Sequence, residues 1–449
     1  MVLAGCSTQK KAEETSTAQA TEAASATQPQ EKETMDLQIL ATSDLHGKFD
    51  PWDYALNEES KSGSMAQIAT AVKELRTENT LLVDAGDTIQ DNSADLFFDE
   101  EIHPMVLAMN EMKYDVWVTG NHEYNFGGDV LKKIISQQKA AVLTGNVKDA
   151  EGNPLADGYT IIEKNGVKIG VIGMVTPNIT RWDSANLEGW TVTDPVEETK
   201  KIISEIKDQT DVLIAAMHMG MNNEYEVKNS GATDLANACP ELDLIVASHE
   251  HQLIPGEEVN GVLVVMNKNS AATLAEVHLM LEKQEDGSWD VVDRTSESLD
   301  MSKYAPDEEL MAKLAPYDER AREDAAVVIG RLEGGDLAPE NEIAEIPTAQ
   351  IQDTALIDLI NEVQMYYTDA DVSAAALFNM NANLKVGDIR KCDTALVYKY
   401  ANTLYKLEMT GAQLKQYMEW TASYYNTWKP KDPVSYTHLR AHETRSNLV

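Results

Sequence analysis

The chain has 449 residues, which is enough for two or three structural units, and 43% of them are hydrophobic, a balance typical of globular proteins. Its 75 acidic side chains outnumber its 37 basic ones, so the formal net charge is −38, which argues against a protein that wraps nucleic-acid polymers. Small anionic substrates fit such a chain only where something local, such as a bound cation, supplies positive charge. The three cysteines, Cys6, Cys239 and Cys392, are too few to build a disulfide scaffold of this length.

The first 36 residues are typical of a lipid anchor followed by a tether. Leu3-Ala4-Gly5-Cys6 resembles the site at which bacterial lipoproteins are cleaved and acylated on cysteine, although the basic start and apolar core of a signal peptide are missing. Residues 7–36 contain no Val, Ile, Leu or aromatic residue, so they are expected to be disordered. We therefore expect an extracytoplasmic protein that is either secreted or held at the membrane only through a lipid on Cys6. The alternative is an ordinary N-terminus with a free or buried cysteine.

From residue 37 to about residue 283, apolar strands alternate with amphipathic helices. Short β-branched runs predict strands at 37–41, 80–83, 116–118, 168–174, 212–216, 242–247 and 262–265. Apolar residues recur on one helical face at 64–76, and Pro104 opens a second helix whose Met stripe is more typical of core packing than of a ligand surface. This alternation predicts a layered α/β domain.

The rest of the chain predicts a connection, a second unit and an unusual end. Residues 303–325 are charged and helical, and 333–346 have the Gly- and Glu-rich composition of a linker. A second unit begins near residue 347, with helices at 354–366 and 411–423 and apolar stretches at 372–377 and 394–407. Residues 434–449 lack periodicity and resemble translated adapter sequence at the end of a gene fragment, so we expect the natural protein to continue beyond about residue 433.

Polar side chains follow five of the predicted strands. In chain order they are Asp44 and His46, Asp87, Asn121 and His122, His218, and His249 and His251. Ligands of open α/β sheets bind at the carboxyl ends of the strands, so these residues are expected to converge. Carboxylate, amide and imidazole ligands suit Zn, Mn, Fe or Co, and a pair of such ions can clamp a phosphoryl group. Each motif alone is common, but the ordered set of five predicts a metal centre.

These motifs resemble the signature of the calcineurin-like metallophosphoesterases, in the strings SDLHG, AGDTIQ, GNHEYNFG and HEHQLIPG. Longer strings resemble the bacterial 2′,3′-cyclic-nucleotide 2′-phosphodiesterase/3′-nucleotidases, relatives of the secreted 5′-nucleotidases; they include SMAQIATAVKEL, TPNITRWDSANLEGW, SAAALF and YANTLYKLEMTGAQLKQYMEWTASYYN. The resemblance covers about residues 37–430. It implies a four-layer α/β sandwich at 37–300, a connecting helix and linker at 301–346, and a partial α/β nucleotide-binding domain at 347–433.

The resemblance also implies roles for the site residues. One divalent metal would bind Asp44, His46 and His251, a second would bind Asn121, His218 and His249, and Asp87 would bridge the two. His122 would be the catalytic residue that stabilises the transition state or protonates the leaving oxygen. Two positions depart from the family pattern: Asn125 stands where 5′-nucleotidases usually have Asp, which favours the cyclic-phosphodiesterase branch, and Ser248 stands where the family usually has Gly.

The nucleoside pocket of the family lies in the second domain. Phe378 and Asn379 match the loop that forms one wall, and Asn121 is expected to contact the substrate as well; alternatively, Phe378 belongs to the core. The expected reaction opens 2′,3′-cyclic nucleotides to 3′-nucleotides and then releases phosphate from them. Three alternatives are a 5′-nucleotidase or sugar-nucleotide hydrolase, a solute-binding lipoprotein, and an impaired homologue with only generic phosphodiesterase activity.

Overall fold

The computed structural model describes residues 32–342, 346–398 and 404–423. Cys6, most of the expected tether and the tail at 434–449 lie outside these residues. The tether was expected to reach residue 36, but the first strand already begins at Thr34. Thr34–Asp36 pair with a later strand through the backbone, as in Thr34 with Glu282, and such pairing does not require apolar side chains.

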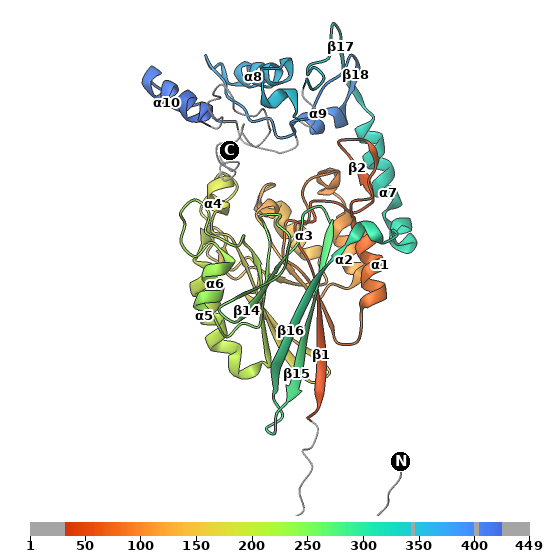
Figure 1. Ribbon diagram of the computed structural model, residues 1–449, viewed down its shortest axis with the longest axis vertical. Helices are drawn as coiled ribbons and strands as arrows, with labels where there is room; N and C mark the ends of the chain where they lie inside the picture. Colours follow the sequence, from red (N-terminus) through yellow and green to blue (C-terminus); the bar gives the residue numbers. More distant parts are fainter. Residues whose placement is uncertain (1–31, 343–345, 399–403, 424–449) are drawn as a thin grey trace, which may run out of the picture.

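Two six-stranded mixed sheets form the body of the protein (Figure 1). The first has a parallel part, β1–β4–β5–β6, and an antiparallel extension through β15 and β16. In spatial order its strands are β16 (Trp289–Asp300), β15 (Thr273–Lys283), β1 (Thr34–Thr42), β4 (Thr80–Asp84), β5 (Val116–Val118) and β6 (Ala141–Leu143).

The second sheet is parallel through its four central strands and antiparallel at both edges. In spatial order its strands are β13 (Ile254–Val259), β14 (Val262–Met266), β12 (Leu244–Ala247), β11 (Val212–His218), β9 (Val167–Val175) and β8 (Tyr159–Lys164). All seven strands expected between residues 37 and 265 are therefore present. The antiparallel strands β8, β13, β15 and β16, together with β6, were not predicted.

Three apolar clusters hold the layers together. One lies between the two sheets and contains alternate residues of both, such as Ile39 and Ile214. The other two lie on the outer faces, where helices cover the sheets. The first outer layer contains α1 (Met65–Leu75), α2 (Pro104–Met112), α3 (Gly128–Gln137) and α7 (Glu308–Ala325), and the second contains α5 (Pro195–Ile206) and α6 (Ala232–Ala238). This is the four-layer α/β sandwich that the resemblance implies.

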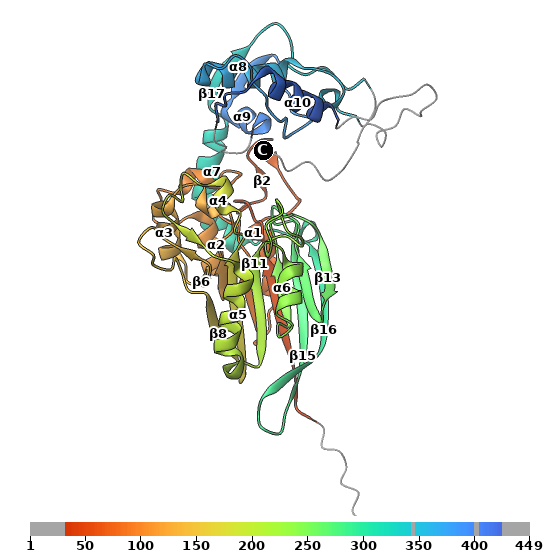
Figure 2. The ribbon, with the colours of Figure 1, turned by 90° about the vertical axis from the view of Figure 1, so that its left-hand side faces the viewer.

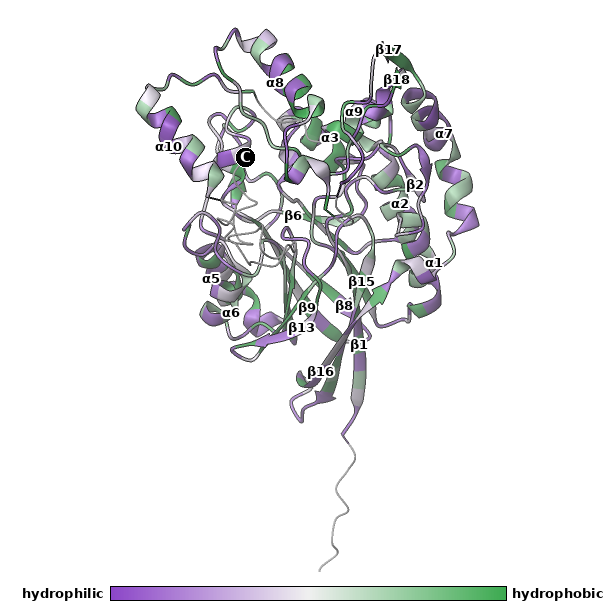
Figure 3. Ribbon diagram, turned by 45° about the horizontal axis from the view of Figure 1, so that its top comes forward, coloured by the Kyte–Doolittle hydropathy of each residue, from purple (hydrophilic) through white to green (hydrophobic). Residues whose placement is uncertain are grey.

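Local sequence explains where the outer helices begin. Ser64 caps α1 by accepting a hydrogen bond from the backbone N–H of Gln67, and Pro104 occupies the first turn of α2, where its missing N–H costs nothing. Hydrophobic residues lie along the central strands, whereas the solvent side of α7 is hydrophilic (Figure 3). The minor elements of the sandwich are β2 (Trp52–Asp53), β3 (Glu58–Glu59), β7 (Val147–Lys148), β10 (Thr191–Val192) and α4 (Ile179–Trp182).

Helix α7 leads from the sandwich to a smaller second unit, which lies beyond the end of the sandwich that also carries α4 (Figures 1 and 2). Its described elements are β17 (Val328–Leu332), α8 (Ala355–Thr368), β18 (Gly387–Arg390), α9 (Lys391–Val397) and α10 (Gly411–Ala422). Its small core is built around Leu356, Ile360, Ala382 and Val397. Asp324 of α7 joins the two units, because it accepts hydrogen bonds from Tyr54 in the sandwich and Lys391 in the second unit. Among the described residues, no helix combines the length and the hydropathy needed to cross a membrane.

Candidate metal centre

The candidate residues lie in the turns that follow β1, β4, β5 and β12, except His218, which is the last residue of β11. Five of them have left-handed backbone conformations, with φ of 51° at Asp44, 46° at His46, 54° at Asp87, 73° at His249 and 56° at His251. Residues other than glycine rarely adopt the left-handed backbone conformation. Where they do, the strained backbone is commonly found at a functional site. The sharp turns bring side chains from both sheets to one edge of the sandwich.

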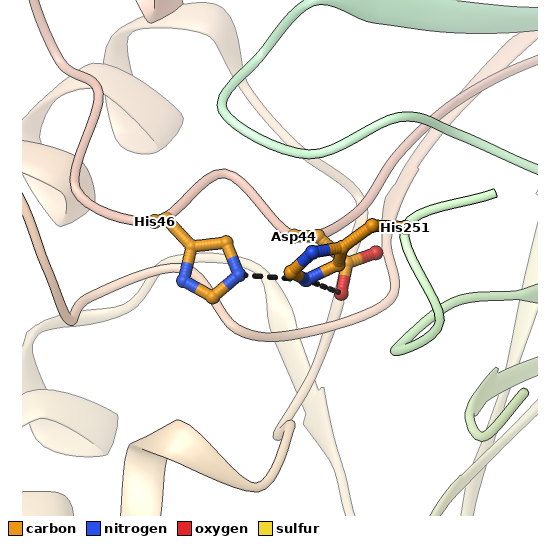
Figure 4. Close-up of side chains that lie close together, drawn as sticks. All are labelled: Asp44, His46 and His251. Carbon is orange, nitrogen blue, oxygen red and sulfur yellow. Dashed lines mark hydrogen bonds and ion pairs between the residues drawn. The ribbon is translucent and has the colours of Figure 1, made fainter. Parts of the chain in front are cut away.

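Asp44, His46 and His251 form the first group (Figure 4). The Nε2 atoms of the two histidines are 3.0 Å apart, and His251 Nε2 is 3.6 Å from Asp44 Oδ1. Asp44 is fully buried, and its Oδ1 accepts the backbone N–H of His249, which links this group to the next. Burial lowers the pKa of His251 to about 4 against the raising effect of Asp44, so its imidazole is neutral near pH 7, the form that binds metals.

Asp87, His218 and His249 form the second group, and Asn121 adjoins it. His218 Nε2 lies 3.1 Å from Asp87 Oδ2 and 3.0 Å from Asn121 Oδ1. Burial would lower the pKa of His218, but the Asp87 carboxylate raises it to about 10. The same negative charge that favours a proton on this imidazole would also attract a cation.

The atoms of both groups fit bound cations. At most one proton can lie between the facing nitrogens of His46 and His251, whereas a shared cation would satisfy both nitrogens and the nearby Asp44. His218 Nδ1 lies 2.8 Å from the carbonyl of Ala85, which accepts the N–H of this nitrogen. A cation would replace the second imidazole proton, the one on Nε2, and would contact the oxygens of Asp87 and Asn121 that this proton faces.

Glu224 was not singled out in the sequence, yet it supports the second group. Both of its carboxylate oxygens lie 3.1 Å from His249 Nε2. An N–H at Nε2 would leave Nδ1 of His249 as the possible metal ligand, an arrangement that fixes the tautomer of many metal-binding histidines. The Trp182 ring packs against the other side of this imidazole, with centroids 5.4 Å apart. Glu224 lies in a long loop after β11, where no sequence periodicity or motif identifies it.

His122 lies beside both groups. Its Nε2 is 4.0 Å from Asp87 Oδ2, and its ring is 5.4 Å from the ring of His46. Its Nδ1 is 2.6 Å from Asn125 Oδ1. Burial opposes the charged imidazolium, but the nearby Asp87 carboxylate and the Asn125 contact raise the pKa of His122 overall. Asn125 in turn donates from Nδ2 to both oxygens of Asp183, at 3.0 and 3.1 Å.

Buried polar residues brace the strand-end loops. Glu123 is fully buried and accepts backbone N–H groups from residues 87–89 and from Gly120, which fastens the Asp87 turn to the turn that carries Asn121 and His122. Ser248, where the family usually has Gly, is also buried, and its hydroxyl lies within hydrogen-bond distance of the carbonyl oxygens of Ala85 and Met217, at 3.2 and 3.0 Å. These contacts hold the turns in place without occupying the centre itself.

Phe378 and Asn379 lie apart from the two groups. With Ala395, Leu396 and Val397 they form one side of a pocket of about 210 Å³, and Asp53, Ala55 and Leu56 of the sandwich form the other. Phe378 is half-buried and packs edge-on against Tyr398, with ring centroids 5.1 Å apart. The pocket lies between the two units, and none of the seven candidate metal ligands lines it.

Comparison with known proteins agrees with this architecture. Residues 37–253 match the family model for calcineurin-like phosphoesterases, and residues 328–443 match the model for the C-terminal domain of 5′-nucleotidases. The solved calcineurin-like phosphoesterase YfkN from Bacillus subtilis is 31% identical, with a TM-score of 0.60, over 65% of this chain and 99% of that one. The chain therefore belongs to the calcineurin-like phosphoesterases, a family of hydrolases.

Several relatives that match most of the chain are named as nucleotide phosphoesterases or nucleotidases. The trifunctional nucleotide phosphoesterase YfkN of Bacillus subtilis is 30% identical over 88% of this chain, which spans only 30% of the length of that protein. A 2′,3′-cyclic-nucleotide 2′-phosphodiesterase/3′-nucleotidase of Yersinia enterocolitica is 27% identical over 91% of this chain and 72% of that protein. A solved putative 5′-nucleotidase from Staphylococcus aureus shares the fold, with a TM-score of 0.74 at 22% identity over 88% of this chain and 78% of that one.

Proposed function

We propose that this protein is a dinuclear-metal phosphoesterase that opens 2′,3′-cyclic nucleotides to 3′-nucleotides and then converts these to nucleoside and phosphate. The observation that carries the proposal is the convergence of two groups of metal-type ligands beside His122 at the carboxyl ends of five strands. Asp44, His46 and His251 would hold one divalent ion, and Asn121, His218 and His249 would hold the other. Asp87 would bridge them. Manganese, zinc, cobalt and iron all suit this set of ligands.

The side chains of the centre have distinct tasks in this reaction. Bound cations would neutralise phosphate charge as Lewis acids. Water adds to phosphorus, the bond from phosphorus to O2′ breaks, and O2′ takes up a proton, which leaves the 3′-monoester. In the second hydrolysis the bond to O3′ breaks in the same way and phosphate is released. His122 would supply the proton to the leaving oxygen from Nε2, a role supported by the contact of its Nδ1 with Asn125.

The choice of substrate rests on two observations. Asn125 replaces the Asp that 5′-nucleotidases usually carry, and three relatives at 27–29% identity are named 2′,3′-cyclic-nucleotide 2′-phosphodiesterase/3′-nucleotidases. Phe378 and Asn379 would contact the nucleoside from the second unit, and Asn121 would contact the phosphate. A second candidate is a 5′-nucleotidase or UDP-sugar hydrolase, favoured by the match of residues 328–443 to the 5′-nucleotidase C-terminal domain.

We also propose that the protein works outside the cytoplasm, either secreted or anchored through a lipid on Cys6. This proposal rests on the residues around Cys6 and on the composition of residues 7–36. No nucleic-acid polymer is expected as a partner, because the net charge is −38.

Hydrolysis of 2′,3′-cyclic AMP, 3′-AMP and 5′-AMP in Mn²⁺ tests the proposed function. We expect faster turnover of the first two substrates, and a loss of about a hundredfold or more in Asp87→Asn but not in the remote control Asp243→Asn.

In the same assay, Phe378→Ala should raise the KM for 3′-AMP about tenfold because base stacking is lost, whereas the exposed control Tyr366→Ala should not. Faster release from 5′-AMP would transfer the assignment to the second candidate.

A further inference from the structure

We infer that Asp183 is a positioning residue for His122 and acts through the side chain of Asn125. The inference rests on the proposed function, in which His122 supplies a proton to the leaving oxygen. It adds a residue from the segment after β9, far along the chain from the motif that contains His122. The three side chains form a relay in which a carboxylate holds an amide and the amide holds an imidazole.

The contacts of Asn125 fix which way its amide points. Asp183 places two carboxylate oxygens 3.0 and 3.1 Å from one end of the amide, and a carboxylate can only accept hydrogen bonds. The amide nitrogen must therefore face Asp183, and the amide oxygen must face His122 Nδ1 at 2.6 Å. An oxygen there accepts an N–H from Nδ1, so the relay fixes the ring orientation and leaves Nε2, which carries the second proton of the imidazolium, free to donate to the leaving oxygen.

Asp183 is itself held in place. It is buried, its backbone N–H donates to the carbonyl of Ile179, and the Asn186 amide donates to its Oδ1 at 3.3 Å. The same Asn186 amide donates to the carbonyls of Tyr124 and Asn125, at 3.1 and 2.8 Å. The segment that carries Asp183 is thus fastened to the turn that carries His122 by both side-chain and backbone contacts.

The charge of Asp183 is not explained by a structural ion pair. Within residues 32–342, 346–398 and 404–423, no Lys or Arg side chain forms a salt bridge with Asp183. Burying a carboxylate without a cation is costly, and amide donors offset only part of that cost. The Asp183 carboxylate orients Asn125 and, through Asn125, His122. These contacts indicate that Asp183 has a role in the reaction.

Hydrolysis of two esters with different leaving groups tests the inference. Asp183→Ala frees the Asn125 amide to rotate, so kcat for 3′-AMP, whose alkoxide needs a proton, should fall about tenfold or more. The kcat for p-nitrophenyl phosphate, whose phenolate leaves unprotonated, should fall less than about threefold. Asp243→Ala removes a carboxylate that accepts the backbone N–H of Leu213 at the start of β11, the opposite end from His218, and should change neither.

A reversed pair distinguishes positioning from a loss of folding. Asn125→Asp alone sets two carboxylates against each other and should be severely impaired. Asn125→Asp combined with Asp183→Asn restores an acceptor for His122 and a donor behind it, so 3′-AMP hydrolysis should recover to within about threefold of wild type.

Two results would overturn the inference: an equal loss on both esters in Asp183→Ala, or no recovery in the double variant. A wild-type chain inactive on every nucleotide would instead overturn the proposed function, and the inference with it.

Discussion

At the scale of single residues, the centre includes supporting side chains to which the sequence motifs assign no role. Glu224 and Asp183 come from loops distant in sequence, yet they contact His249 directly and His122 through Asn125. Both contacts constrain an imidazole that the sequence motifs identify. The motif residues define which chemistry is possible, and these supporting carboxylates define the orientation in which it takes place.

Glu224→Gln tests the support of His249. A Gln side chain can present its NH₂ group to Nε2 and no longer favours an N–H there, so we expect the affinity for one of two bound Mn²⁺ ions to fall about 10- to 100-fold. Calorimetric titration of the metal-free protein would measure both affinities. Glu226→Gln changes an exposed residue of the same loop and is the matched control. Identical titrations of the two variants would show that Glu224 does not support a metal ligand.

At the scale of elements, α7 is held to the sandwich by charged contacts near a buried carboxyl group. Arg322 of α7 donates to Asp318 of the same helix and to Glu59 of the sandwich, and it lies over the Trp52 ring of the sandwich. Asp50, in the loop after β1, is fully buried nearby. Burial, and after it the neighbouring Asp318, raises the pKa of Asp50 to about 8.

This pKa implies a pH-dependent stability. The folded state binds the proton of Asp50 more tightly than the unfolded state, so the stabilisation is complete below about pH 4 and is lost as the pH rises toward 8. Asp50→Asn should therefore reduce the stability difference between pH 5 and pH 8 by at least about 1 kcal/mol. Urea unfolding at pH 5 and pH 8 measures the difference in the free energy of unfolding, and the exposed Asp99→Asn variant is the control. An undiminished difference in Asp50→Asn would mean that Asp50 is ionised in the folded protein.

The parallel strands and the elements around them differ in how far they could be predicted. Short runs such as Val116–Val118 are buried on both faces and read as continuous apolar segments, so all seven were recognised. Half of the residues of strand β16 are exposed, and many are polar, as in Asp290 and Glu297, so its pairing with β15 gave no hydrophobic signal. The apolar stretch at 372–377 forms neither strand nor helix, and residues 394–397 belong to α9.

At the scale of the whole molecule, the division into two sheets could not be derived from periodicity. Strands β1 and β11 have similar buried patterns, yet they lie in different sheets packed against one another. The resemblance supplied this arrangement and the assignment of Asp44 and His251 to one metal, whereas the convergence of these residues was expected from their positions at the carboxyl ends of strands. Phe378 could be placed in the second unit from the sequence, but not in a pocket shared with Leu56 of the sandwich, because that contact depends on how α7 orients the two units.

The metal content of the purified full chain tests the central claim most directly. After loading with Mn²⁺ and removal of free ions, elemental analysis should find about two ions per wild-type chain and about one in each of His251→Ala and His218→Ala. His278→Ala is the matched control, because His278 lies on β15 and pairs with Asp36, so it should retain two. One ion or none in the wild type, or equal contents in all four proteins, would contradict a dinuclear centre built from these two groups.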